Sequence, residues 1–322
     1  MHSFRLLAAA VVASALFRSE HAPAQTRIWI DTDPSIGSPY REVDDAFALV
    51  VAFHSPERRI AGISTTYGNA GLKRTTTVAR DLVRRFGAPA GVTEACVYAG
   101  SAGNDTLGRS TAATQALAAV LKEERLTYVA LGPLTNLATL LQVHPELASR
   151  LDGVIFVGGR TPGRALAFGT NGWLQIHDAN VFKDPTAARV VFESKVPLLL
   201  APTEVGAQLV LTRDDARKLS SDGAAGRFLQ RGSRIWLWFW TAIVRHPGGP
   251  MFDSLAVIAA VKPELVGLEK RYAAVLPDGD LIAARKPFRN SREVSFCTRA
   301  EATAKTIIIN ALKRDVAAQS SR

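Results

Sequence analysis

The chain has 322 residues, a formal net charge of +10 and 47% apolar residues, which is enough material for one large domain or two smaller ones with a sizeable core. Its basic residues are scattered and form no stripe interleaved with aromatic side chains, so nucleic-acid binding is disfavoured. The composition contains no linker, repeat or low-complexity tract, and we therefore expect one domain over residues 25–322.

The first 24 residues have the pattern of a secretory signal peptide. An apolar run at residues 6–17 follows a short basic start, and residues 22–24, Ala-Pro-Ala, fit the small-residue rule for cleavage. The run is too short to cross a bilayer, which disfavours a retained membrane anchor. The sequence thus predicts a periplasmic or secreted mature chain, in which Cys96 and Cys297 could pair, although no pattern places them near each other.

Four aspartates gather at the end of the first predicted strand and the start of the first predicted helix. They are Asp31, Asp33, Asp44 and Asp45. Singly each would be a turn or helix cap, but four clustered carboxylates repel one another unless a cation neutralises them. Oxygen ligands alone favour calcium or magnesium over zinc. Because adjacent helical residues point about 100° apart, we expect one of the two helical aspartates to hold metal and the other to hold substrate.

The chain continues as an alternation of strands and helices. Strands are expected at Ile28–Ile30, Arg59–Thr65, Thr127–Leu131, Gly153–Val157 and Pro197–Ala201. Helices are expected over residues 42–54, 71–86 and 112–124, and further helices should begin near Gly132 and Met251. Between these last two, one aromatic-rich helix should carry Phe228 to Trp240. This order predicts an α/β domain with a mostly parallel central sheet, helices on both faces and a ligand site at the carboxyl ends of the strands.

Several polar residues follow these strands and could either cap a helix or bind a ligand. Asn69 follows the second strand, Asp178 and Asn180 follow a Gly-rich loop, and Asp253 opens the last helix. Asp178 and Asn180 point to one side if the chain is extended there. Trp236, Trp238 and Trp240 are too closely spaced to share one helix face, so some must enter the core while others line a cavity.

These segments together resemble the signature of the nucleoside hydrolases, calcium-dependent enzymes that cut the N-glycosidic bond of ribonucleosides. The resemblance begins with Asp-Thr-Asp-Pro at 31–34 and Val-Asp-Asp-Ala-Phe-Ala-Leu at 43–49. It continues through Gly68-Asn69, Gly-Pro-Leu-Thr-Asn at 132–136, Asp178-Ala-Asn180 with Asp-Pro-Thr-Ala-Ala at 184–188, and Phe252-Asp253. The matched segments cover most of the mature chain.

The resemblance implies specific roles for these residues. The Ca²⁺ ligands would be Asp31, Asp33, Asp45, Asp253 and the main-chain carbonyl of Leu131, a normal calcium ligand whatever its side chain. Asp33 would be the general base toward water. Ribose would be held by Asp44, Asn171, Asp178 and Asn180, and Asn69 would also contact the substrate. One or two of Trp236, Trp238 and Trp240 would stack on the base. A homo-oligomer, dimer or tetramer, is expected on the same ground.

Three departures from the family pattern affect the expected chemistry. Residues 35–43 form an insertion of about seven residues between Asp-Pro and Asp-Asp, a lengthened loop. Asp178 replaces the usual glutamate, and Phe252 stands where the family has the histidine that protonates the leaving base. Either His177 or His246 serves instead, or the enzyme prefers bases that leave without help. We therefore expect slower hydrolysis of inosine than of p-nitrophenyl riboside.

Two other functions compete with nucleoside hydrolysis. A secreted protein that binds calcium and ribose without turnover is favoured by the insertion and by Phe252, but it would not need the water-activating carboxylate of Asp33. A cation-dependent phosphohydrolase would need Lys or Arg converging on phosphate, and no such motif accompanies the aspartates.

Overall fold

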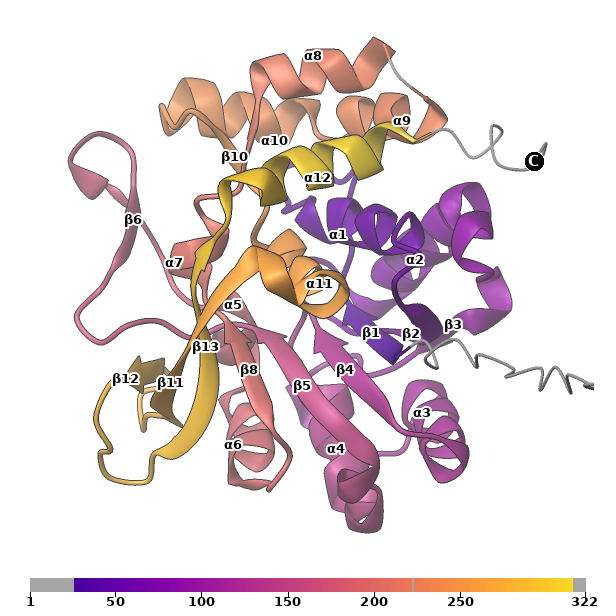
Figure 1. The fold of residues 1–322 in the computed structure, drawn as a ribbon, viewed down its shortest axis with the longest axis vertical. Helices are drawn as coiled ribbons and strands as arrows, with labels where there is room; N and C mark the ends of the chain where they lie inside the picture. Colours follow the sequence, from indigo (N-terminus) through magenta and orange to yellow (C-terminus); the bar gives the residue numbers. More distant parts are fainter. Residues whose placement is uncertain (1–25, 222, 315–322) are drawn as a thin grey trace, which may run out of the picture.

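The computed structural model describes residues 26–221 and 223–314, and the predicted signal peptide lies outside the described residues. Its centre is a nine-stranded sheet in the order β12-β11-β13-β8-β5-β4-β1-β2-β3 (Figure 1). The strands are β1 (Arg27–Thr32), β2 (Arg59–Thr65), β3 (Val97–Ala99), β4 (Leu126–Ala130), β5 (Leu151–Val157), β8 (Leu198–Ala201), β11 (Val266–Val275), β12 (Leu281–Ala284) and β13 (Arg292–Ala300). All neighbouring pairs from β3 to β13 are parallel, whereas β11 pairs antiparallel with both β13 and the edge strand β12. The predicted α/β fold with a mostly parallel sheet is confirmed.

Helices cover both faces of the sheet and form two separate apolar cores (Figure 1). One face carries α1 (Asp44–Phe53), α2 (Leu72–Phe86), α11 (Phe252–Val261) and α12 (Ala302–Lys313), and the other carries α3 (Ala112–Glu123), α4 (Thr135–Val143) and α6 (Pro185–Glu193). Successive strand residues point to opposite faces, so Ile28 and Ile30 enter the first core while Trp29 enters the second.

The two helices closest to the site are unusual in having no exposed residue. All ten residues of α1 and all ten of α11 are buried, and the two helices pack against each other. Helices that are apolar all round belong in a protein core. The aspartates in their first turns are therefore carried into the interior, where a charge needs a partner.

The remaining elements lie around this core and include the main differences from the predicted elements. The single aromatic-rich helix is divided into α9 (Ala224–Gly232), α10 (Arg234–Trp238) and a π-helical turn at Phe239–Ile243. The other elements are α5 (Ala179–Lys183), α7 (Thr203–Gly206), α8 (Arg213–Ser221) and the strand pairs β6 (Leu166–Phe168) with β7 (Leu174–Ile176) and β9 (Val210–Thr212) with β10 (Gly248–Pro250). Short 3₁₀ turns occur at Ala88–Ala90, Glu94–Cys96, Asn104–Thr106, Pro145–Arg150, Thr170–Gly172 and Pro263–Leu265.

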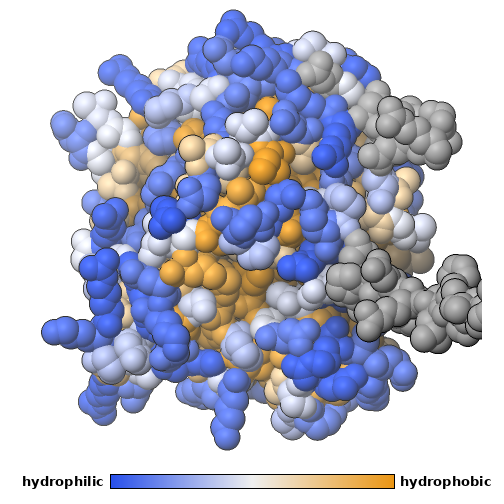
Figure 2. Space-filling view, in the orientation of Figure 1, coloured by the Kyte–Doolittle hydropathy of each residue, from blue (hydrophilic) through white to orange (hydrophobic). Residues whose placement is uncertain are grey.

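The surface is mainly hydrophilic at its edges, with apolar residues gathered near the middle of the face shown in Figure 2. None of the helices within the described residues is both long and apolar enough to cross a membrane. Cys96 and Cys297 are both free thiols, the first beside the edge strand β3 and the second inside β13.

Candidate active site

The carboxyl ends of β1, β2, β4 and β5 and the first turns of α1 and α11 meet at one place. Asp33 directly follows β1, and Pro34, which lacks a backbone N–H, helps to end the strand there. The inserted segment 35–43 then closes on itself, because Ser35 Oγ donates to the carbonyl of Glu42 at 2.6 Å. The chain re-enters the site at Asp44, the first residue of α1.

The structure brings the two adjacent carboxylates of α1 together with a third from α11, which lies far away in the sequence. Oxygens of Asp44, Asp45 and Asp253 all lie within 4.8 Å of one another, and all three residues are buried. The backbone N–H of Asp253 donates to Asp44 Oδ2 at 3.2 Å, which joins the first turns of α1 and α11. The positive ends of both helix dipoles therefore face the group. Burial first, and then the neighbouring carboxylates, raise the pKa values of Asp44 and Asp253 well above the usual range.

Both helical aspartates belong to this group, and the division of roles between them stays a prediction. Although Asp44 and Asp45 are adjacent in α1, both approach Asp253 closely enough to share one cation. The reason is that Asp253 reaches the first turn of α1 from a neighbouring helix, a position that the spacing within α1 does not reveal.

Asp33 lies beside this group and keeps one oxygen without a partner. Its Oδ2 accepts from the backbone N–H of Asn69 at 2.6 Å and lies 3.9 Å from Lys183 Nζ. Its Oδ1 is buried and has no hydrogen-bond partner among the described residues. Burial and the charge of Asp45 raise the pKa of Asp33, while Lys183 opposes this rise. An unpaired buried carboxylate oxygen is costly unless a cation or a water contacts it.

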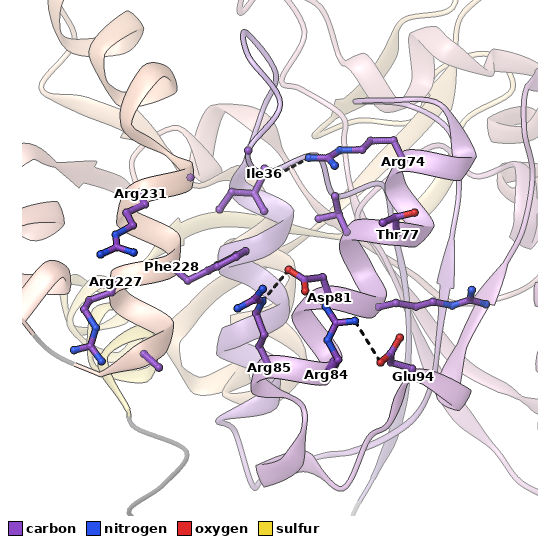
Figure 3. Close-up of a pocket in the computed structure, with 15 residues that line it drawn as sticks. Ile36, Arg74, Thr77, Asp81, Arg84, Arg85, Glu94, Arg227, Phe228 and Arg231 are labelled. Carbon is purple, nitrogen blue, oxygen red and sulfur yellow. Dashed lines mark hydrogen bonds and ion pairs between the residues drawn. The ribbon is translucent and has the colours of Figure 1, made fainter.

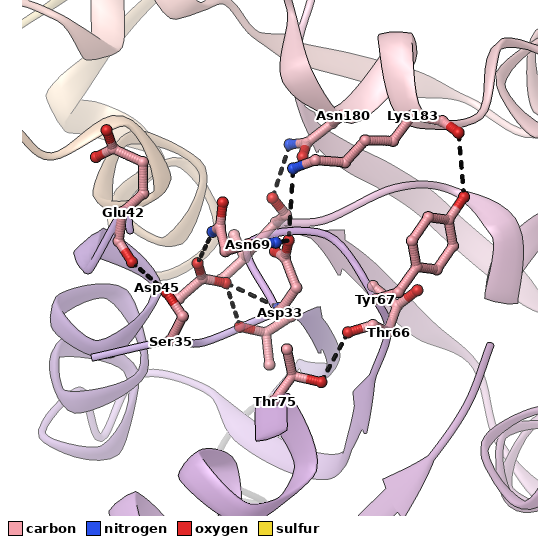
Figure 4. A network of polar contacts seen from close by, with 12 residues as sticks. Asp33, Ser35, Glu42, Asp45, Thr66, Tyr67, Asn69, Thr75, Asn180 and Lys183 are labelled. Carbon is pink, nitrogen blue, oxygen red and sulfur yellow. Dashed lines mark hydrogen bonds and ion pairs between the residues drawn. The ribbon is translucent and has the colours of Figure 1, made fainter. Parts of the chain in front are cut away.

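Asp45 is the best-supported carboxylate of the site (Figure 4). Its Oδ1 accepts from Thr32 Oγ1 at 2.6 Å and from the backbone N–H of Asp33 at 3.0 Å, and its Oδ2 accepts from Asn69 Nδ2 at 2.9 Å. Asn69 therefore holds two aspartates at once, one with its backbone and one with its side chain. These bonds fix the carboxylates without using their remaining lone pairs.

Asp31 stands apart from the three grouped carboxylates, although it was predicted as a metal ligand. Its Oδ1 accepts from Ser64 Oγ at 2.5 Å and from Asn136 Nδ2 at 2.8 Å, while its buried Oδ2 has no hydrogen-bond partner within the described part of the chain. Burial raises its pKa from 3.8 to about 6. These contacts link β1 to β2 and α4, so the geometry favours a supporting position behind Asp33 over direct contact with an ion.

The two residues predicted to hold ribose on the other side of the site are anchored to the backbone. Asn180 Nδ2 donates to the carbonyls of Leu131 at 2.7 Å and Val157 at 3.0 Å, the ends of β4 and β5. Asp178 caps α5, with Oδ1 accepting from Val181 N at 3.3 Å and Oδ2 from Gly159 N at 2.6 Å. Burial raises the pKa of Asp178 to about 6.

A cavity of about 210 Å³ opens onto these residues. The predicted residues that line it are Asp44, Asn69, Leu131, Asp178, Asn180 and Asp253. Phe252 also lines it, so the apolar ring occupies the wall where the family resemblance led us to look for a proton donor. Of the two candidate replacements, His177 lies on the cavity wall, whereas His246 packs against Phe168 and Trp240 away from it.

Three predicted substrate contacts are not placed on this cavity. Asn171 is exposed in the turn between β6 and β7, where its φ of 61° suits an asparagine in a tight turn. Trp240 is 1% exposed and packs edge-on against Phe168, and Trp236 is 5% exposed. The expectation that these two rings stack on the base is corrected, because both pack into the first apolar core and neither lines the cavity.

Two charged residues of the site were missed in the sequence. Glu42, at the end of the inserted segment, lines the cavity and accepts from Trp236 Nε1 at 2.6 Å, and burial raises its pKa to about 7. Lys183, at the end of α5, reaches Asp33. The insertion itself was the available signal for Glu42, whereas no local pattern distinguishes Lys183 from a surface lysine.

A larger cavity, about 830 Å³, lies elsewhere between α2 and α9 (Figure 3). Its walls carry arginines, among them Arg84 and Arg85 on α2 and Arg227 and Arg231 on α9, together with Asp81 and Glu94. None of the site aspartates of the preceding paragraphs, Asp31, Asp33, Asp44, Asp45, Asp178 and Asp253, lines this larger cavity. We therefore assign the candidate site by its chemistry to the smaller cavity.

Comparison with known proteins identifies relatives of this arrangement. The sequence profile of the inosine-uridine preferring nucleoside hydrolases matches residues 28–310. A probable uridine nucleosidase 2 of Arabidopsis thaliana is 30% identical over 284 residues, covering 79% of this chain and 83% of that protein. A non-specific ribonucleoside hydrolase of Salmonella enteritidis is 27% identical, covering 81% of this chain and 86% of that protein.

Solved structures have the same fold. A plant nucleoside hydrolase aligns with a TM-score of 0.75 at 22% identity, covering 90% of this chain and 99% of that one. A purine-preferring ribonucleoside hydrolase from Gardnerella vaginalis aligns with a TM-score of 0.70 at 23% identity, covering 89% and 99%.

Proposed function

The chain belongs to the inosine-uridine preferring nucleoside hydrolase family, and from this premise we propose that it hydrolyses the N-glycosidic bond of ribonucleosides in a calcium-dependent reaction. The products would be a free base and ribose. The observation that carries the proposal is the group of buried carboxylates, Asp44, Asp45 and Asp253, beside the half-satisfied carboxylate of Asp33.

The residues present fit a hard divalent cation. The grouped ligand atoms are all oxygens, three of them lie within 4.8 Å of one another, and the buried Asp33 Oδ1 has no partner in the region that the structure describes. Asp45 and Asp253 would be the main side-chain ligands, with Asp33 and the carbonyl of Leu131 beside them. This carbonyl already accepts from Asn180, but its second lone pair is available. When bound, calcium supplies Lewis acidity toward water and toward the ribose hydroxyls.

The side chains would then divide the work of hydrolysis. Asp33 accepts the proton of the attacking water as the water oxygen bonds to the anomeric carbon and the bond to the base breaks. Asp44, Asp178 and Asn180 accept or donate hydrogen bonds to the ribose hydroxyls. The surrounding negative charge stabilises the positive sugar of the transition state. Phe252 has no proton to give, so another group of the cavity wall would protonate the departing base, and His177 is the predicted donor that lies there.

The test is release of ribose from a panel of purine and pyrimidine ribonucleosides, measured with calcium and with chelator. Asp33→Asn should abolish release, because it removes the proposed base while conserving the size of the side chain. The matched control is Asp214→Asn on the exposed helix α8, which should leave the rate unchanged. Release that persists in Asp33→Asn or in chelator would contradict the proposal.

Phe252 favours one second function, a nucleoside-binding protein without turnover. In that case a nucleoside and calcium would raise the melting temperature of the protein while no ribose appeared. We also propose that the mature chain acts in the periplasm or outside the cell and forms a homo-oligomer. N-terminal sequencing of the exported protein, and its mass in solution, would test these two points.

A further inference from the structure

Lys183 brings a positive charge to the proposed calcium site. It is the last residue of α5, and its Nζ lies 3.9 Å from Asp33 Oδ2 (Figure 4). Its side chain is 23% exposed, whereas that of Asp33 is 1% exposed. The ammonium group therefore approaches the carboxylate from the solvent side of a nearly closed site.

The backbone at Lys183 is held firmly, so this approach is built into the fold. Its carbonyl accepts from Tyr67 Oη at 3.2 Å, which ties α5 to the segment after β2. The next residue, Asp184, caps α6 through Ala187 N at 2.8 Å and accepts from Thr135 Oγ1 at 2.6 Å. Contacts on both sides of the lysine fix where its side chain begins.

Lys183 is also the cation available to the acidic site within the part of the chain that the structure describes. Among the described residues, the ion pair with Asp33 is the only one that involves any of five buried aspartates of the site, Asp31, Asp33, Asp44, Asp45 and Asp253. A single positive charge only partly offsets this group. It must also repel a divalent ion that binds to the same carboxylates, because both act in a poorly hydrated interior.

We propose that Lys183 is a built-in counter-ion that competes with the divalent cation for Asp33. The proposal rests on the calcium site proposed above. Without metal, Lys183 stabilises the fold by reducing the repulsion among the carboxylates. With metal, it lowers the affinity of the site, so the ambient calcium concentration decides how much of the protein is loaded.

The experiment compares calcium binding by calorimetry in metal-stripped full-length protein. Lys183→Met keeps the length of the side chain but removes the charge, and Lys183→Gln is a second neutral variant. Lys183→Arg keeps the charge. The matched control is Lys195→Met. Lys195 is exposed on the loop before β8 and lies far in sequence from the five aspartates. We expect both neutral variants to bind calcium at least tenfold more tightly, and the other two to bind like the wild type.

A second readout is thermal unfolding, which does not depend on activity. In chelator, the neutral Lys183 variants should melt below the wild type, because the carboxylates have lost their counter-ion. In saturating calcium this difference should shrink or reverse, because the competing charge is gone. This dependence of the difference on calcium distinguishes competition from a general loss of packing, which would lower the melting temperature in both conditions.

The outcomes separate this inference from the proposed function. Unchanged or weaker calcium binding in both neutral variants, with wild-type binding intact, would overturn the role of Lys183 alone. Calcium binding by none of the variants would overturn both the counter-ion and the calcium site. Tighter binding in Lys183→Arg as well would show that the shape of the lysine, not its charge, limits the affinity, and this result too would overturn the inference.

Discussion

Gly68 offers a way to disturb the proposed base without changing any reactive group. A methyl group added at Gly68 would lie 1.8 Å from Asp33 Oδ2, 2.8 Å from Asp33 Cγ and 3.2 Å from Pro133 Cδ. Asp33 is 1% exposed and is held by the backbone N–H of Asn69 at 2.6 Å. The carboxylate therefore has almost no free space into which it could move.

The size of the effect follows from this overlap. Ordinary contacts of a Cβ atom begin near 3.4 Å, so the methyl group of Gly68→Ala intrudes by 3.4 − 1.8 = 1.6 Å on Asp33 Oδ2. Overpacking of this kind costs about 1–3 kcal/mol of stability. A misplacement of about 1 Å at a reacting group lowers the rate by about 100-fold. We expect kcat/KM to fall by at least this factor and the melting temperature to fall with it.

The assay is ribose release in saturating calcium, with circular dichroism to confirm folding. The control is Gly71→Ala, three residues further on, where an added Cβ meets no atom within 4 Å. This variant should retain wild-type rate and stability. If Gly68→Ala were folded and fully active, Asp33 would not be the base in the position described, and the mechanism would have to be reassigned.

Four other outcomes follow from the structure. Asp253→Asn should lower calcium affinity at least tenfold in calorimetry, because it removes one of three grouped carboxylates, and unchanged affinity would place the ion elsewhere. Burial raises the pKa of Asp31 from 3.8 to about 6, so the metal-free fold holds a proton that the unfolded chain has released, and its stability should fall as the pH rises through about 6. Thermal unfolding in chelator should therefore give a lower melting temperature at about pH 7 than at about pH 5, and calcium should reduce this difference. A higher melting temperature at about pH 7 than at about pH 5 in chelator would contradict the raised pKa of Asp31. Because Phe252 cannot donate a proton, p-nitrophenyl riboside should be hydrolysed faster than inosine, and equal kcat/KM values would refute this. Trp236→Phe removes the indole N–H that donates a hydrogen bond to Glu42 at 2.6 Å. KM for nucleosides should rise if substrate binding requires Glu42 to be held at the cavity wall, and an unchanged KM would show that it does not.

The family and the outline of the fold could be predicted from the sequence because both depend on local patterns. The alternation of apolar strands and amphipathic helices identified a mostly parallel sheet, and the carboxyl ends of such strands meet at one edge. Asp33, Asp45 and Asn69 were found in this way, and each lies in the site. The antiparallel end of the sheet, β11 and β12, was not predicted, because the pairing of strands depends on contacts between segments that local patterns do not reveal.

The sequence by itself determined which carboxylates are available, and only the tertiary structure decided which of them meet. Asp44 and Asp253 are separated by 209 residues, and they come together because α1 packs against α11 in the core. The same long-range packing sets Asp31 apart, buries Trp236 and Trp240, and brings Lys183 to Asp33. Periodicity reports how a residue lies within its own helix or strand, whereas the electrostatics of a buried site depend on distances between elements, which are fixed only when the core closes.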